Sequence, residues 1–233
     1  MPKIVKKNLN LALVGARGKM GEAIQELVAK DRGLKVTALI NTPKDWEEVD
    51  PRSVDVVIEF SSPKGMLNAL AWCLKFKKPF VSGTTGISTK DRGALTRAAK
   101  KIPVLYSANM SMGIAVMSAM LKAFGAIKEW NFQIEEAHHA HKKDKPSGTA
   151  LLLQQTLKSV VGRKLPEPLS IREGEIPGTH EVWAEGPEET LVLQHTATNR
   201  RIFARGALRA ARWLFDKKRP GLYDLSHLYI VRF

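Results

Sequence analysis

The chain has 233 residues, 44% of them hydrophobic, and carries a formal net charge of +14. This length supports one large domain or two small ones with real cores, and the absence of an apolar run of about eighteen residues predicts that no segment spans a membrane. The one cysteine, Cys73, excludes an internal disulfide and favours a cytoplasmic location. The charge fits nucleic acid, an anionic small ligand or a merely basic surface, and the scatter of basic residues along the chain favours the anionic ligand.

The first predicted element is an apolar strand, residues 9–14, that leads into a glycine-rich turn and then a helix. In that context the spacing of Gly15, Gly18 and Gly21 is a variant of the dinucleotide-binding fingerprint, although a plain turn is the alternative. Gly15 permits the tight turn, Gly18 lets backbone amides approach a pyrophosphate, and Gly21 lets the helix pack closely on the strand. The predicted cofactor-binding residues of this turn are Gly15, Ala16, Arg17, Gly18, Lys19 and Met20.

Strands and helices then alternate as far as residue 111. Strands are predicted at 34–40, 54–60, from residue 80 onward and at 104–106, with helices at 63–77 and 91–101. This alternation predicts an α/β fold with a parallel, doubly wound sheet. Small polar residues follow two of the strands, at 82–86 and 107–111, where an open sheet of this kind meets its ligand.

The pattern changes after Asn109. Helices are predicted at 113–127, 150–160 and 207–215, and strands at 132–137, 170–172, 181–183, 191–193 and 201–203. Proline and glycine pairs separate the later strands. We therefore expect a second, mixed α+β domain.

Three of the six histidines lie at positions 138, 139 and 141, and lysines follow at 142, 143 and 145. Ser147 can cap the apolar helix that comes next, and a helix N-terminus beside lysines binds anions. Imidazoles move protons near neutral pH, so the stretch predicts a small anionic substrate that is protonated during the reaction. A solvated loop is the plain alternative. We predict no metal, because zinc-ligand spacing is absent and the lysines repel cations.

The ordered set of motifs resembles the 4-hydroxy-tetrahydrodipicolinate reductase family, formerly called dihydrodipicolinate reductase, of bacterial lysine biosynthesis. The most specific motif is the His-His-x-His-Lys run at 138–142, followed by Lys-Pro-Ser-Gly-Thr-Ala at 145–150. The others lie at 14–21, 83–86, 107–111, 172–174, 177–180 and 203–207, so the resemblance covers nearly the whole chain.

The resemblance implies a Rossmann-type dinucleotide-binding domain of residues 1–108 and 207–233. It implies a substrate-binding and oligomerisation domain of residues 109–206, in a homotetramer. The implied reaction is hydride transfer from NADPH or NADH to a ring that bears two carboxylates, which converts 4-hydroxy-tetrahydrodipicolinate to tetrahydrodipicolinate. We expect neither nucleic acid nor a membrane as a partner.

The resemblance also implies a role for individual residues. His138 is the implied proton donor and Lys142 the second catalytic residue, whereas we expect His141 to support the site without touching the substrate or to be structural. The implied substrate-binding residues are His139, Ser147, Gly148 and Thr149. The residues implied to line the nicotinamide side are Gly83, Thr84, Thr85, Ala108, Asn109, Met110 and Ser111.

One departure from the dinucleotide pattern concerns Asn41, which follows the second strand and is itself a predicted cofactor-binding residue. An acidic residue usually ends this strand, where it bonds the ribose hydroxyls of NAD. Here the strand is followed by Asn-Thr-Pro-Lys and has no carboxylate at its end. Since the element that would repel a 2′-phosphate is missing, we predict that NADPH is accepted at least as well as NADH.

Two rival interpretations remain open from the residues alone. One is another Rossmann oxidoreductase that acts on a different small acid. Rossmann oxidoreductases that use a catalytic cysteine would lack the 138–149 motifs. Cys73 lies in a predicted helix, where it is poorly placed to act as a nucleophile. The other is a basic nucleic-acid-binding or regulatory protein without catalysis, for which salt-dependent binding of a duplex would be evidence.

Overall fold

The computed structural model describes residues 8–228, which form two compact units. The first comprises residues 8–110 and 203–228, and the second comprises residues 111–202. The sequence placed the boundaries at 108/109 and 206/207, which both lie slightly inside the first unit. Gly206 gives a physical reason for the difference at the second boundary, because a Cβ at this position would lie 1.7 Å from the carbonyl oxygen of Met110. This close backbone approach joins the returning chain to the first unit before residue 207.

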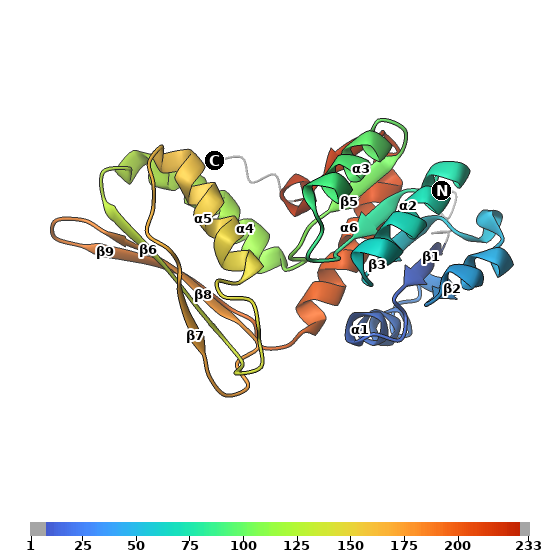
Figure 1. Ribbon diagram of the computed structural model, residues 1–233, viewed down its shortest axis with the longest axis horizontal. Helices are drawn as coiled ribbons and strands as arrows, with labels where there is room; N and C mark the ends of the chain where they lie inside the picture. The colour runs from blue at the N-terminus through green and yellow to red at the C-terminus, as the bar shows by residue number, and fades with distance from the viewer. Residues whose placement is uncertain (1–7, 229–233) are drawn as a thin grey trace, which may run out of the picture. The chain divides into compact units, whose positions relative to one another are not determined.

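The first unit contains a six-stranded, wholly parallel sheet (Figure 1). Its strands are β1 (Leu9–Val14), β2 (Leu34–Ile40), β3 (Val56–Glu59), β4 (Phe80–Ser82), β5 (Pro103–Tyr106) and β10 (Gly221–Tyr223), in the order β10-β5-β4-β3-β1-β2. The chain leaves β1 for β2 on one side and returns to β3 on the other, so β1 ends at a topological switch point. This confirms the predicted doubly wound sheet.

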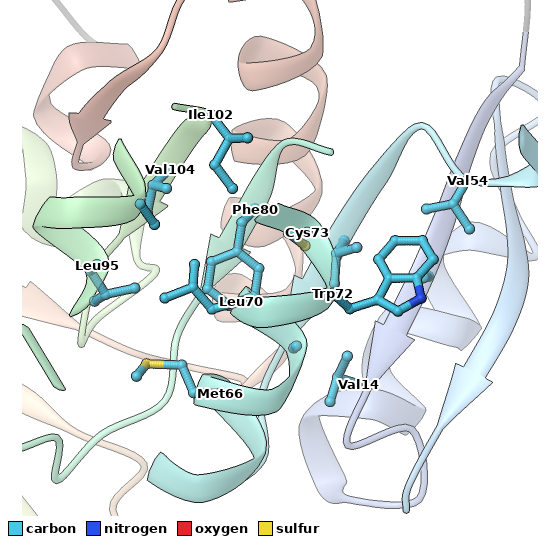
Figure 2. Packing of buried hydrophobic residues seen from close by; sticks show 14 of the residues in the cluster. Val14, Val54, Met66, Leu70, Trp72, Cys73, Phe80, Leu95, Ile102 and Val104 are labelled. Carbon is cyan, nitrogen blue, oxygen red and sulfur yellow. The ribbon is translucent and has the colours of Figure 1, made fainter. Parts of the chain in front are cut away.

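The helices of this unit cover both faces of the sheet. They are α1 (Lys19–Val28), α2 (Pro63–Phe76), α3 (Thr89–Ala99) and α6 (Arg201–Lys217), with short 3₁₀ turns η1 (Pro43–Glu48), η2 (Pro51–Ser53) and η4 (Leu225–Leu228). Helices α2 and α3 share one apolar core with the strands, in which Phe80 of β4 lies against Leu70 and Cys73 of α2 (Figure 2). Helices α1 and α6 lie on the other face (Figure 1), where Asp31 pairs with Arg212.

Cys73 is fully buried in this core, and its burial raises the pKa of the thiol well above the usual value. A buried, protonated thiol is a poor nucleophile. The structure therefore disfavours the rival in which a cysteine forms a covalent intermediate.

The second unit is a four-stranded mixed sheet with one face covered by helices (Figure 1). Its elements are α4 (Met112–Met120), η3 (Leu121–Ile127), β6 (Asn131–His138), α5 (Gly148–Val161), β7 (Leu169–Arg172), β8 (Thr179–Glu185) and β9 (Thr190–Thr196). The strand order is β7-β6-β8-β9, with β7 parallel to β6 and the other pairs antiparallel. Alternate residues of β6 are buried, and Phe132 and Ile134 pack with α5 in the core. The predicted mixed second domain is confirmed as a fold class.

Two local predictions were wrong, and one strand was missed. Residues 201–203 are not a strand but the first turn of α6, where the Asn199 side chain accepts a hydrogen bond of 2.8 Å from the Arg201 amide. The predicted helix 113–127 is divided into α4 and the 3₁₀ segment η3, which contains Gly125, a residue of low helix propensity. The sequence also missed β10, because this strand has only three residues and its first, Gly221, belongs to the Pro-Gly pair that was read as a turn. None of the helices within residues 8–228 combines the length and the apolar character needed to cross a membrane.

Candidate active site and nucleotide site

The predicted proton donor, His138, is the last residue of β6 and is 8% exposed. Two residues earlier, on the same face of the strand, lies Glu136, which is 2% exposed. The Glu136 carboxylate makes a close contact with Nδ1 of His138 through Oε2. Both carboxylate oxygens also accept hydrogen bonds from the guanidinium of Arg172 on the neighbouring strand β7, at 3.0 Å and 2.6 Å. The structure thus places the His138 imidazole in a buried ion-pair network.

The charges of this network follow from burial and pairing. Burial by itself would raise the pKa of Glu136, but the hydrogen bonds from Arg172 and His138 outweigh it and lower the pKa to about 2. For His138, burial lowers the pKa, and the adjacent Glu136 carboxylate opposes this effect only in part. At neutral pH in the absence of substrate, Glu136 is therefore ionised and His138 is neutral.

A second buried histidine, His180 of β8, lies beside the first. Its ring meets that of His138 edge-on at a centroid distance of 5.0 Å, and its Nε2 lies 3.2 Å from the hydroxyl of Ser147. Burial, with a further contribution from the charge of nearby His138, lowers the pKa of His180 to about 3. His180 is thus a neutral residue that connects the imidazole to the start of α5.

The N-terminus of α5 has the anion-binding features that the sequence predicted. Ser147 caps the helix by accepting a hydrogen bond of 3.2 Å from the Ala150 amide, and its own amide donates to Glu136 over 3.2 Å. Gly148 is exposed, with open space around the position where a Cβ would lie, and Thr149 is half-buried. The backbone at 148–149 thus lies at the surface, and the Gly148 amide donates to the Asp144 carboxylate, which occupies the place that a ligand carboxylate would take.

The basic residues of the loop after β6 are not equivalent. Lys142 is half-buried and forms a 2.7 Å ion pair with Asp144, whereas Lys143 and Lys145 are exposed. The ring of His139 lies 3.2 Å from the guanidinium of Arg200, a residue that sequence reasoning did not select. His141 is exposed, with its ring 6.4 Å from that of His139.

In the first unit, the glycine turn has the geometry expected of a nucleotide-binding loop. Gly15 has φ of +80°, and a Cβ on it would lie 2.1 Å from the carbonyl oxygen of Phe60. Gly21 packs against the same turn, where a Cβ would meet the Gly15 carbonyl oxygen at 2.4 Å. Gly18 is the N-cap of α1, so the free amides of the first helical turn follow it directly. The loop can therefore hold a pyrophosphate on the backbone of residues 15–20.

The end of β2 corrects one prediction. The Asn41 side chain accepts a hydrogen bond of 2.9 Å from the Arg17 amide, which ties it to the glycine turn. The Asp45 carboxylate also lies here, because it accepts hydrogen bonds from the amides of Asn41 and Thr42 at 2.7 Å and 2.9 Å. These hydrogen bonds lower the pKa of Asp45, with a smaller contribution from the charge of Arg17. A carboxylate is thus present where the local sequence indicated none.

The predicted nicotinamide-side residues are organised around a buried carboxylate, Glu59 at the end of β3, which sequence reasoning missed. Glu59 is fully buried and accepts hydrogen bonds from the hydroxyls of Ser61, Ser82 and Thr84, all at 2.6–2.8 Å. Gly83 lies on the ring of Phe60, at 2.1 Å from a built Cβ to the nearest ring atom, so no side chain fits there. Glu59 therefore fixes the start of the 83–85 loop.

The last predicted group, residues 108–111, is divided between the two units. Ala108 is exposed, Asn109 is half-buried and Met110 is buried in the first unit. Ser111 belongs to the second unit, where its hydroxyl caps α4 and lies 3.1 Å from Nε2 of His195. The described structure assigns Ser111 a capping role within the second unit.

Known protein families and relatives match the chain over both of its units. A family model described as "Dihydrodipicolinate reductase, N-terminus" matches residues 9–110, and one described as "Dihydrodipicolinate reductase, C-terminus" matches residues 113–229. The 4-hydroxy-tetrahydrodipicolinate reductase of Bdellovibrio bacteriovorus is 43% identical over 94% of this chain and 95% of its own. That of Rickettsia bellii is 38% identical over 95% of this chain and 94% of its own.

The chain belongs to the dihydrodipicolinate reductase family. It is therefore an NAD(P)H-dependent oxidoreductase with a dinucleotide-binding Rossmann unit. Among solved structures, the dipicolinate-bound dihydrodipicolinate reductase of Paenisporosarcina sp. TG-14 has the same fold, with a TM-score of 0.77 at 20% identity, over 95% of this chain and 99% of that one.

Within the described part of this reductase, one group of side chains lies close enough together to hold a cation: Glu136, His138 and His180. Both oxygens of Glu136 already accept hydrogen bonds from Arg172, and the Ser147 amide donates to one of them. A metal ion would have to displace a guanidinium that already neutralises the carboxylate. We interpret the group as an ion-pair network.

Proposed function

We propose that this chain reduces 4-hydroxy-2,3,4,5-tetrahydrodipicolinate to 2,3,4,5-tetrahydrodipicolinate in lysine and diaminopimelate biosynthesis. The observation that carries the proposal is family membership across both units, with relatives that match nearly the full length. When bound, the reduced nicotinamide supplies a hydride to the substrate ring. One proton is taken up and the ring hydroxyl leaves as water, so atoms and charge balance.

In this proposal His138 donates the proton. Its Nδ1 is in contact with Glu136, so Nε2 is the nitrogen that remains to meet a substrate. The neutral imidazole must first gain a proton, and a bound dicarboxylate favours this because it adds negative charge nearby. Lys142, half-buried in the same unit, supplies a fixed positive charge, provided that the substrate takes the place of Asp144 in its ion pair.

The substrate carboxylates would bind to the N-terminus of α5 and to the cations near it. The amides of Gly148 and Thr149 and the capped first turn suit one carboxylate. His139 and Arg200 lie together and offer donors for the other. The exposed lysines 143 and 145 would act at longer range by attracting the dianion.

For the cofactor, we propose that the backbone of the glycine turn holds the pyrophosphate and that the 83–85 and 108–110 segments line the nicotinamide side. Asn41 and Arg17 would lie at the ribose of the adenosine. NADPH acceptance at least equal to that of NADH remains our prediction, now with Asp45 as a factor that reduces the preference.

We also propose that residues 8–110 and 203–228 act as the nucleotide-binding domain, and that residues 111–202 bind substrate and form a homotetramer. Four large apolar side chains on the edge strands of the second sheet favour an oligomer, because they are 40–54% exposed: Leu169, Ile171, Leu191 and Val192.

The decisive experiment follows NAD(P)H absorbance after addition of freshly generated dihydrodipicolinate synthase product. We expect rapid oxidation by the wild type, and a loss of turnover of about a hundredfold in His138→Gln with little change in nucleotide affinity. The matched control is His141→Gln, because His141 is exposed nearby. Lack of oxidation by the folded wild type would contradict the function, and a loss below about fivefold in folded His138→Gln would contradict the role of His138.

A further inference from the structure

The proposed proton donor does not stand alone at the end of β6. Its Nδ1 contacts the Glu136 carboxylate, and that carboxylate is held from three directions. Arg172 donates two hydrogen bonds to it from β7, the Ser147 amide donates a third from the start of α5, and Glu136 itself projects from β6. The Glu136 side chain is completely buried and cannot reorient without breaking these bonds.

This contact determines which nitrogen of His138 carries the hydrogen in the neutral ring. An ionised carboxylate can only accept, so the nitrogen next to it must donate. Nδ1 of His138 therefore bears the hydrogen, and Nε2 is left as the acceptor. On the far side, Nε2 faces Gly178, where a built Cβ would lie only 3.0 Å away. Any larger residue at 178 would crowd the reacting nitrogen.

The same contact stabilises the ring once it is protonated. An imidazolium at position 138 would face three groups besides Glu136: the guanidinium of Arg172, the ammonium of Lys142 and the neutral ring of His180. The two cations disfavour a further positive charge. Glu136 is the one carboxylate in direct contact with the imidazole among the described residues, and it offsets them.

A purely structural explanation must be weighed against this. A buried Glu–Arg pair can simply join two strands, and then its contact with the histidine would be incidental. The geometry argues against that explanation, because Arg172 leaves Oε2 in close contact with the ring and does not separate the two side chains.

We propose that Glu136 is a positioning residue for the proton-transfer step: it orients the His138 ring, fixes Nδ1 as the protonated nitrogen and directs Nε2 to the substrate. Arg172 supports this role by holding the carboxylate in place. The proposal rests on the proposed function of His138 and goes beyond it, since it assigns the role to a residue that need not touch the substrate.

The test uses three variants of the full-length protein. Glu136→Gln removes the charge but leaves the Arg172 guanidinium with only the carbonyl oxygens of Ile171 and Asp144 and no charged partner. Glu136→Gln/Arg172→Met therefore removes both charges together, so that no unpaired cation remains at this site. Glu136→Asp keeps the charge and shortens the reach. Glu135→Gln is the matched control, because Glu135 lies one residue away, half-buried on the opposite face of β6.

The first readout is the pH titration of the His138 ring by NMR, which does not depend on activity. We expect the His138 pKa to fall by about one unit or more in Glu136→Gln, to fall less in the double variant because that variant also loses the opposing charge of Arg172, and to hold in Glu135→Gln. The second readout is the pH profile of turnover. Its alkaline limb should move to lower pH by a similar amount, with kcat at pH 7.5 reduced about tenfold or more and partly restored in Glu136→Asp.

An unchanged His138 pKa in folded Glu136→Gln would overturn the proposal. So would a loss of kcat with no displacement of the pH profile, since that is the result of a structural role alone. Failure of the proposed function is distinguishable, because in that case the folded wild type itself would not oxidise NAD(P)H, whereas turnover retained in His138→Gln would contradict only the role of His138.

Discussion

At the scale of single residues, the lysines after the histidine cluster differ in their surroundings although they are alike in the sequence. Lys142 is half-buried in an ion pair with Asp144, and Lys143 and Lys145 are exposed. A catalytic ammonium must be held in one place, whereas a steering charge acts from anywhere on the surface.

We therefore expect Lys142→Ala to lower kcat on the order of a hundredfold. Lys143→Ala and Lys145→Ala, the matched controls, should raise the substrate KM a few fold and leave kcat nearly unchanged. Steady-state kinetics at low and at moderate salt would separate the two effects, because salt screens the exposed charges. Equal losses of kcat in all three variants would show that general positive charge is what matters.

Asp45 provides a second test at this scale. Its carboxylate lies beside Asn41 and within the electrostatic influence of Arg17, where it would repel a 2′-phosphate on the adenosine ribose. We expect Asp45→Asn to tighten NADPH binding about two- to fivefold and to change NADH binding little. Direct titration of nucleotide fluorescence measures both dissociation constants. The control is Glu47→Gln in the same 3₁₀ turn, an exposed carboxylate.

Two results would contradict these expectations for the cofactor. If the ratio of the two dissociation constants is the same in Asp45→Asn and in wild type, the carboxylate does not reach the nucleotide. A tenfold advantage of NADH in the specificity constant of the wild type would refute the prediction that NADPH is accepted at least as well.

At the scale of elements, the loop after β4 depends on a carboxylate from the neighbouring strand. Glu59 accepts hydrogen bonds from four donors on Ser61, Ser82 and Thr84, and within residues 8–228 no cation forms an ion pair with it. Replacing this acceptor leaves several buried donors without partners, and each costs about 1–3 kcal/mol.

We expect Glu59→Gln to lower the free energy of unfolding by about 2–4 kcal/mol and to weaken nucleotide binding, because the 83–85 loop loses its anchor. Urea unfolding and nucleotide titration would measure the two effects. Thr84→Val, which removes a single donor, should show a smaller loss of stability than Glu59→Gln. A Glu59→Gln variant with wild-type stability would mean that water replaces the carboxylate in the network.

At the scale of the whole molecule, the buried ionisable groups predict sensitivity to acid. His180 has its pKa lowered to about 3 by burial, so the folded state resists protonation that the unfolded chain accepts near pH 6.5. Its contribution to stability is complete above that pH and is lost as the pH falls toward 3. Glu136, with its pKa lowered to about 2, extends the loss below pH 4.5.

We expect His180 alone to account for a decrease in unfolding free energy of about 2 kcal/mol between pH 7 and pH 5. Denaturant titrations at the two pH values measure the decrease, which should be smaller by that amount in His180→Gln. The exposed His141→Gln serves as the control and should follow the wild type. An identical pH dependence in His180→Gln and wild type would show that His180 does not control acid stability.

The sequence by itself determined the fold class, most element positions and the family. The sequence located β2 at residues 34–40 without error, although this strand lies at the edge of the sheet and only its first and last residues are buried. The glycine turn and the 138–150 motif were readable because each depends on residues close together in the chain. The end of α4 and the start of α6 could not be read from the sequence, because tertiary contacts and capping outweigh local propensity there.

Only the tertiary structure decided which residues surround His138. Glu136, Arg172, His180 and Ser147 come from three strands and a helix start, and strand pairing brings them together. It also decided that Asp45 reaches the end of β2, since a 3₁₀ turn folds a residue four positions away back onto Asn41. Local motifs specify the chemistry of this chain, whereas the charge and orientation of its reactive groups depend on contacts between residues distant in sequence.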